Sequence, residues 1–319
     1  MSYSCSKDGG LSFAPPQVAF QVPNMSLGMR RGPRIVATGK SLVVTAVGGE
    51  KGKGQDGDVL AWTSPDGGES WIGPTKVNDV ADSAREGLHA MAAGADGTTW
   101  CVWLDLRAMT TELYASKSTD GGVTWSANTL VYRSPEKSVC QCCHPSIAMD
   151  GANIHVLFRN SLDGNRDMYI VSSLDGGHSF LPAQRLGQGN WALNACPMDG
   201  GMLAIGPNGS VSTVWRRGGE LFFTTHKVQE APLGKGEQPW LASSKLDTFA
   251  VWTEGRVGRL RLRQLSAASS RVLDEQARDP MIVSSDNCTV ACWESIGDSQ
   301  TSVVVLNVVP LSSKVLDSK

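Results

Sequence analysis

The sequence repeats one octapeptide pattern, Ser-x-Asp-Gly-Gly-x-Ser/Thr-aromatic, four times. In this pattern the aspartate can cap a tight turn through its carboxylate, the glycines supply positive-φ positions, and the aromatic ring anchors the returning strand. The four aspartates are separated by 58, 54 and 55 residues, which indicates a repeat architecture with one supersecondary unit per repeat. The copies occupy residues 6–13, 64–71, 118–125 and 173–180.

Strand-length apolar and alternating runs recur in register with the octapeptides. They predict the second strand of each unit at residues 41–49, 99–106, 154–161, 210–217, 248–255 and 288–295. They predict the third strand at residues 58–64, 112–118, 167–173, 220–226, 259–265 and 302–308. Six strands of each kind predict six units, and no helix of any length is expected.

The octapeptides resemble the Asp boxes of the sialidase superfamily. This resemblance implies an all-β, six-bladed, sialidase-like β-propeller in which residues 1–319 form a single domain. Residues 16–22 read as a strand with nothing before it. We expect this strand to pair with the last blade, so that residues 1–22 complete that blade and close the ring, which hides two sheet edges.

Composition excludes several classes of protein. The 319 residues carry a net charge of -2, which argues against a nucleic-acid surface. No run approaches the 18 or so apolar residues of a membrane-spanning helix, so we expect no membrane insertion. Residues 1–5 lack the basic start and apolar run of a signal peptide. Because proteins with Asp boxes are often exported, we expect a bacterial protein of the periplasm or the exterior, monomeric because a closed ring leaves no free edge.

The functional face of such a propeller is expected where the first strand of each blade begins, and the Asp boxes lie on the opposite rim as structural turns. Polar residues precede several predicted first strands, often beside a proline, and others follow the second strands. They predict a charged channel mouth that binds a small-molecule, peptide or glycan ligand, although a solvated rim of ion pairs would have the same composition. The candidate catalytic residues are Arg34, Asp58, Glu86, His89, Asp105, Arg107, Arg159 and Arg216.

The cysteines form the sharpest cluster. Cys140, Cys142, Cys143 and His144 fall within five residues, and Cys196 precedes the next blade. Thiolates with an imidazole favour a zinc or copper ion as cofactor. The Cys-x-Cys-Cys spacing matches no zinc finger, and one or two disulfides, for instance from Cys196 to the cluster, are the alternative in an oxidising compartment.

The sialidase resemblance can be tested against the residues. It implies three arginines that hold a substrate carboxylate, for which Arg34 matches the first and Arg216 and Arg256 are candidates. It also implies an acid near Asp56 or Asp58 and a tyrosine nucleophile from the last part of the propeller. The four tyrosines all lie at or before residue 169. This departure argues against the sialidase mechanism.

Three hypotheses follow. The chain is a metalloprotein with a copper or zinc site at the channel mouth, serving redox chemistry, metal binding or a metal-dependent reaction, and we favour this reading. Alternatively, it is an exo-α-sialidase-type glycoside hydrolase acting on sialic acid or another acidic sugar. The third hypothesis is a non-catalytic propeller that binds a glycan or a protein, with its cysteines as structural staples.

Overall fold

The computed structural model describes residues 1–39, 41–94, 96–206, 209–225, 229–285, 288–297 and 302–309, the last segment by its backbone alone. The described residues form β-strands and connecting turns, with no α-helix among them. None of these residues therefore belongs to a helix able to cross a membrane.

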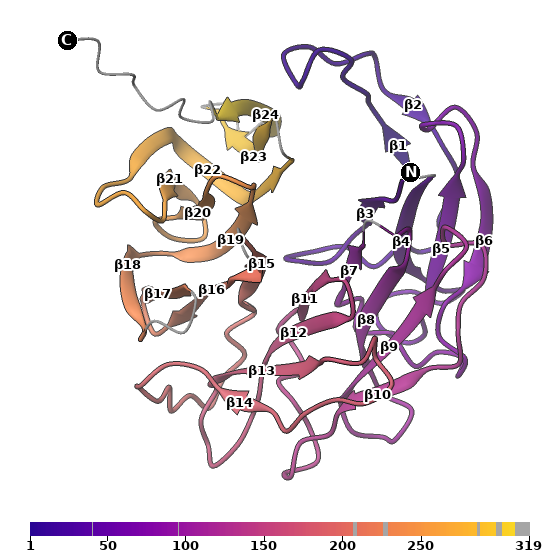
Figure 1. Ribbon diagram of the computed structural model, residues 1–319, viewed down its shortest axis with the longest axis horizontal. Helices are drawn as coiled ribbons and strands as arrows, with labels where there is room; N and C mark the ends of the chain where they lie inside the picture. Colours follow the sequence, from indigo (N-terminus) through magenta and orange to yellow (C-terminus); the bar gives the residue numbers. More distant parts are fainter. Residues whose placement is uncertain are drawn as a thin grey trace. The chain divides into compact units, whose positions relative to one another are not determined.

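Four sheets are four-stranded antiparallel meanders in chain order, the blade arrangement of a β-propeller (Figure 1). The first contains β3 (Arg34–Ala37), β4 (Leu42–Gly48), β5 (Asp58–Ser64) and β6 (Ile72–Lys76). The second contains β7 (His89–Ala93), β8 (Thr99–Asp105), β9 (Glu112–Ser118) and β10 (Thr129–Tyr132). The third contains β11 (Ser146–Asp150), β12 (Asn153–Arg159), β13 (Met168–Ser173) and β14 (Gln184–Arg185). The fourth contains β15 (Met202–Ile205), β16 (Val211–Arg217), β17 (Glu220–Thr225) and β18 (Ala231–Lys235).

The predicted second and third strands coincide with observed strands to within two residues at each end. His226, the predicted last residue of one of them, lies outside the described residues. Periodicity located these strands well because those whose side chains are described bury many of their apolar residues in a core.

The prediction of six separate blades is wrong, since the described chain holds five sheets of four or more strands. The fifth sheet has six strands: β19 (Glu237–Ser243), β20 (Thr248–Thr253), β21 (Gly258–Gln264), β22 (Arg271–Ser284), β23 (Thr289–Ile296) and β24 (Ser302–Val309). The long strand β22 joins the last two expected blades, because Ala277 pairs with Gly258 of β21 on one side and with Ser295 of β23 on the other. No glycine interrupts residues 271–284, so the outer strand of one unit continues into the inner strand of the next.

The predicted pairing of residues 16–22 with the last blade is also wrong. Within this segment β2 (Gln17–Val18) pairs antiparallel with β1 (Ser2–Tyr3) in a two-stranded sheet of its own. The first Asp box lies between these two strands, and the chain turns back there: the Ala14 amide donates to the Cys5 carbonyl and the Ala19 amide to the Met1 carbonyl.

The chain packs as two compact units. One comprises residues 1–3, 17–203 and 215–218, and the other comprises the remaining segments. The core of the first unit follows the two-residue period of its strands, as β8 shows. Trp100, Val102 and Leu104 pack into one apolar cluster with residues of β12, whereas Cys101 and Trp103 pack into another with Val47 and Val59 and their neighbours.

Each Asp box is a hydrogen-bonded turn, as its sequence predicted. In the third box the Ser118 hydroxyl donates to Asp120 and accepts the Gly122 amide at 2.8 Å, while Asp120 accepts the Thr124 amide at 2.9 Å. The other three boxes repeat these contacts. The third box also contacts the first sheet, since the Gly121 carbonyl accepts hydrogen bonds from Thr63 of β5 and from Ser41, which directly precedes β4. Their role here is structural.

We predict that Gly177→Ala destabilises the protein far more than Gly176→Ala. Both glycines have positive φ, 85° and 69°, so each alanine incurs a similar backbone cost of about 1–2 kcal/mol. A Cβ at Gly177 would also lie 2.2 Å from Trp100 Cη2, whereas one at Gly176 would meet nothing. Overpacking adds about 1–3 kcal/mol. Urea titration of both variants measures the difference in unfolding free energy, and equal losses would contradict this packing.

Candidate functional site

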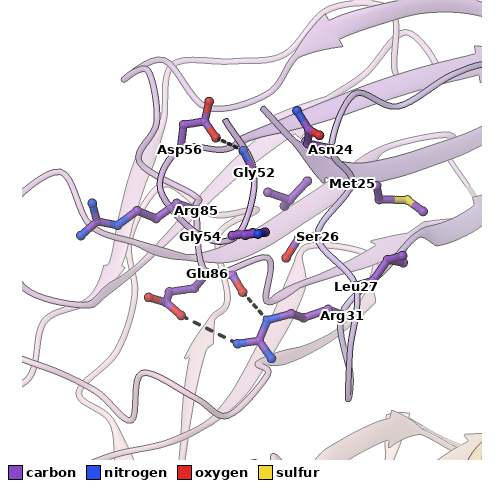
Figure 2. Close-up of a pocket in the computed structure, with 13 residues that line it drawn as sticks. Asn24, Met25, Ser26, Leu27, Arg31, Gly52, Gly54, Asp56, Arg85 and Glu86 are labelled. Atoms are coloured by element: carbon purple, nitrogen blue, oxygen red, sulfur yellow. Dashed lines mark hydrogen bonds and ion pairs between the residues drawn. The ribbon is translucent and has the colours of Figure 1, made fainter. Parts of the chain in front are cut away.

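A cavity of about 520 Å³ opens in the first unit (Figure 2). Its walls come from the segment before β3, from the glycine-rich loop between β4 and β5, and from the turn before β7. Each of these segments either precedes the first strand of a sheet or joins the second strand of a sheet to the third. Sequence analysis expected functional residues near these positions. Charged side chains of Arg31, Lys53, Asp56, Arg85 and Glu86 line it.

Arg31 and Glu86 interact across this cavity. Figure 2 shows the Arg31 guanidinium directed at Glu86, with Nε donating to the Glu86 carbonyl at 2.7 Å and Nη2 at 3.8 Å from the carboxylate. The Glu86 side chain keeps one third of its surface exposed. Gly87 follows with φ of 71°, and a Cβ there would come 2.1 Å from Ser26 Oγ, so the turn accepts only glycine beside Glu86.

Asp56 has a structural task in the loop. Its carboxylate accepts the backbone amides of Glu50, Lys51 and Gly52 at 2.7–2.8 Å. These hydrogen bonds, that from Lys51 first, lower the pKa of Asp56. Asp56 therefore orders the glycine-rich loop, which leaves Glu86 as the carboxylate of the cavity that is available to a ligand.

The three clustered cysteines converge in the turn before β11. Cys140 Sγ lies 3.7 Å from Cys142 Sγ and 3.4 Å from Cys143 Sγ, and all three sulfurs lie within 4.8 Å of one another. Cys140 and Cys143 are buried, and Cys142 is partly exposed. Cys196, which was predicted to join them, is an exposed cysteine between β14 and β15 and lies outside the group of sulfurs within 4.8 Å of one another. The structure thus brings three of the four predicted thiols together, and Cys196 is not among them.

The pKa values of Cys140 and Cys143 shift in opposite directions. Hydrogen bonds with the Cys142 and Cys143 thiols lower the pKa of Cys140, and the Arg159 guanidinium contributes in the same direction. Burial, followed by the interactions with Cys140 and Cys142, raises the pKa of Cys143.

His144 and His89 are buried neutral imidazoles. Burial, reinforced by Arg30, Arg34 and Arg159, holds the pKa of His144 well below its usual range. Burial and then Arg34 lower the pKa of His89 to about 3, and its Nε2 lies 3.0 Å from Thr45 Oγ1. Neither imidazole is protonated near neutral pH.

Several predicted site residues are engaged in structural contacts. Asp105, fully buried, binds Ser83, Trp103 and Arg107, and Arg107 also binds Asp79 at 2.9 Å. Asp58 pairs with Lys76 at 2.5 Å.

The predicted arginines mostly bind backbone. Arg34 donates to the carbonyls of Arg30, Gly32 and Pro33, and Arg159 donates to those of Arg166, Asp199 and Arg216. Arg216 Nη1 lies 3.9 Å from Asp199 Oδ2, and the Arg216 guanidinium carbon lies 5.6 Å from the centroid of the Trp191 ring. In the second unit Arg256 pairs with Asp279 at 3.0 Å.

Sequence reasoning placed Glu86 at the functional face and the sialidase resemblance named Asp56, but both missed Lys53 and the part that the glycine-rich loop plays in lining the cavity. The signal available was the run of glycines in residues 48–57, which marks a loop whose backbone approaches other groups closely.

The sheets and Asp boxes define the class of protein as a β-propeller. The family model of the BNR repeat-like domain matches residues 32–217, more than half of the chain, and the chain belongs to this family. No curated protein matches the sequence.

Solved structures resemble this chain over almost its whole length. The GH93 α-L-arabinofuranosidase of Fusarium graminearum in complex with arabinobiose matches with a TM-score of 0.60 and 14% identity, covering 92% of this chain and 96% of that one. The intramolecular trans-sialidase from Ruminococcus gnavus matches with a TM-score of 0.57 and 10% identity, covering 89% and 95%. A protein of unknown function from Dyadobacter fermentans matches with a TM-score of 0.59 and 13% identity, covering 91% and 96%. These likenesses show the fold, and with the repeat family they confirm the sialidase-like superfamily that the Asp boxes predicted.

Proposed function

We propose that this chain is a glycoside hydrolase that binds an acidic sugar in the cavity of Arg31 and Glu86. The observation that carries the proposal is a polar cavity of about 520 Å³ in which a partly exposed carboxylate faces an arginine. The size suits a small ligand such as a sugar. The fold is shared with enzymes named for glycoside and sialoside chemistry.

The charges of the cavity favour an anionic sugar. Arg31, Lys53 and Arg85 contribute three positive charges to its walls, and Asp56 and Glu86 contribute two negative ones. Because Asp56 is bound by three backbone amides, its charge is already compensated by the loop. A ligand carboxylate would find charge-assisted donors here, of which the guanidinium groups can bind it in bidentate fashion.

Glu86 is the residue we assign to proton transfer. A general acid must reach the glycosidic oxygen, and a carboxyl group that is one third exposed in a cavity can do so. Arg31 holds the backbone and the side chain of Glu86 from the same side, which fixes the position of the carboxylate. The proposal thereby gives the two residues distinct roles, with Glu86 transferring the proton and Arg31 positioning it.

A panel of fluorogenic glycosides tests this function. The purified chain is assayed with a methylumbelliferyl sialoside, a glucuronide and an α-L-arabinofuranoside, before and after treatment with a metal chelator. We expect turnover of an acidic glycoside that survives the chelator. Turnover of the arabinofuranoside alone would overturn the acidic specificity, and no turnover of any glycoside in a broad panel would overturn the enzymatic proposal.

A second candidate function is metal binding, favoured by the three sulfurs that lie within 4.8 Å of one another. Thiolates at this spacing suit a zinc or copper(I) ion. Export from a bacterial cell, a monomeric state and a ligand at the channel mouth stay predictions beside both functions.

A further inference from the structure

Cys140 has a thiol neighbour on each of two sides. Its sulfur lies 3.4 Å from Cys143 Sγ and 3.7 Å from Cys142 Sγ, and all three are free thiols. A disulfide bond is about 2.05 Å long, so the sulfurs of either pair must approach by about 1.5 Å to bond. A change of rotamer moves a cysteine sulfur farther than this. Either pair is therefore close enough to form a disulfide after a local rearrangement.

The backbone fixes Cys140 at the start of the turn. The Val139 amide donates to Thr111 O at 2.9 Å, and the Cys140 amide donates to Arg159 O at 3.0 Å. Cys142 follows in the turn itself, and strand β11 begins at Ser146. The turn thus holds Cys142 close to an anchored sulfur.

Burial decides which of the three thiols a dissolved reagent can reach. Cys140 and Cys143 each keep 1% of their surface exposed, whereas Cys142 is partly exposed. Thiol–disulfide exchange begins when a thiolate attacks a sulfur of a disulfide, so the reagent must reach the attacking thiol. Cys142 is the cysteine of this turn that meets that condition. A mixed disulfide formed there would have its leaving half toward solvent and Cys140 on its buried side.

We infer that this turn is a thiol–disulfide exchange site for disulfides of low molecular mass, with Cys142 as the entry thiol and Cys140 as the resolving thiol. Cys142 loses its proton to solvent and attacks the substrate, forming a mixed disulfide and releasing one substrate thiolate, which takes up a proton. Cys140 then loses its proton and attacks Cys142 Sγ, forming the Cys140–Cys142 disulfide and releasing the second thiolate. Two electrons pass from the two cysteines to the substrate, which leaves as two thiols. This activity goes beyond both candidate functions and requires thiols that hold no metal.

Cys143 keeps its thiol in this scheme. It lies closer to Cys140 than Cys142 does, but both members of that pair are buried, so a dissolved disulfide cannot start the exchange there. Cys142 and Cys143 are consecutive, and their Cα atoms are about 3.8 Å apart, below the usual range of about 4.4–6.8 Å for a disulfide. The Cys140–Cys142 pair therefore combines access with acceptable geometry.

Reaction with glutathione disulfide tests the inference. Protein that has been reduced and freed of metal with a chelator is incubated with an excess of glutathione disulfide. Remaining thiols are then alkylated under acid quench, and the peptides are mapped by mass spectrometry. Wild type should contain the Cys140–Cys142 disulfide and alkylated Cys143. The release of two molecules of reduced glutathione per disulfide formed checks the balance of the reaction.

Three variants separate the roles of the thiols. Cys140→Ser should stop at a mixed disulfide of Cys142 with glutathione, because the resolving sulfur is missing. Cys142→Ser should leave Cys140 and Cys143 as thiols over the time in which wild type reacts completely. Cys5→Ser is the matched control, since it removes an exposed free cysteine from outside the turn, and it should form the disulfide like wild type.

The wild-type map alone can overturn the inference, so the test does not depend on the folding of any variant. A mixed disulfide that persists on Cys142 would overturn the resolving role of Cys140. A disulfide that contains Cys143 would overturn the assignment of the pair, and three unreacted thiols would overturn the exchange site altogether. Circular dichroism confirms that each variant used in the comparison is folded.

Discussion

Replacing Glu86 with glutamine should abolish most turnover of an acidic glycoside while leaving the sugar bound. Glutamine keeps the size of the side chain but cannot donate a carboxyl proton, so we expect kcat to fall by about 10²–10⁴-fold. The dissociation constant of the sugar, measured by calorimetry, should change much less because the cationic walls of Arg31, Lys53 and Arg85 are intact.

Glu69→Gln is the control for this substitution. Glu69 is an exposed glutamate in an Asp box, outside the residues that line the cavity, and its replacement removes the same charge from the protein. Its kcat should match wild type. If Glu86→Gln retained wild-type kcat, the assignment of proton transfer to Glu86 would be wrong.

The largest loss of stability should follow from Asp105→Ala. The Asp105 carboxylate is fully buried and accepts hydrogen bonds from Ser83 Oγ at 2.8 Å and Trp103 Nε1 at 2.7 Å. It also forms two bonds of 2.9 Å with the Arg107 guanidinium. Removing it leaves an indole N–H and a guanidinium without their buried acceptor, which costs about 3–5 kcal/mol of unfolding free energy.

Chemical denaturation of Asp105→Ala beside Asp150→Ala measures this effect. Asp150 is an exposed aspartate at the end of β11, so its replacement should change the unfolding free energy by less than about 0.5 kcal/mol. A small effect at both positions would contradict the buried network. A folded, stable Asp105→Ala protein that lost only its activity would instead support the catalytic role that sequence analysis considered for Asp105.

Much of the fold could be predicted because its signals are local. Each Asp box carries its own hydrogen-bonding groups within eight residues, and strands such as β8 are buried on both faces and read as apolar runs. The continuity of β22 and the pairing of β2 with β1 were not predictable in this way. They depend on which edges meet, and Pro280 inside β22 even suggested a strand start, whereas the structure accommodates it at a shift of register.

The same distinction between local and tertiary features applies to the candidate site. The convergence of Cys140, Cys142 and Cys143 follows from their adjacency in one turn. The placement of Cys196 beside them depended on the repeat register and stays a prediction. Sequence could not show which charged groups have partners. Asp58 and Asp105 look like Glu86 in a list of rim residues, but tertiary contacts commit the first two to Lys76, Arg107 and their neighbours.

A crystal structure of the Glu86→Gln protein soaked with the acidic glycoside that wild type hydrolyses tests the central claim most directly. We predict the sugar in the cavity of Figure 2, with its carboxylate on the guanidinium of Arg31 or Arg85 and the amide introduced at position 86 within about 3 Å of the glycosidic oxygen. A sugar bound outside this cavity, or one in it with no contact to the side chain at position 86, would contradict the account.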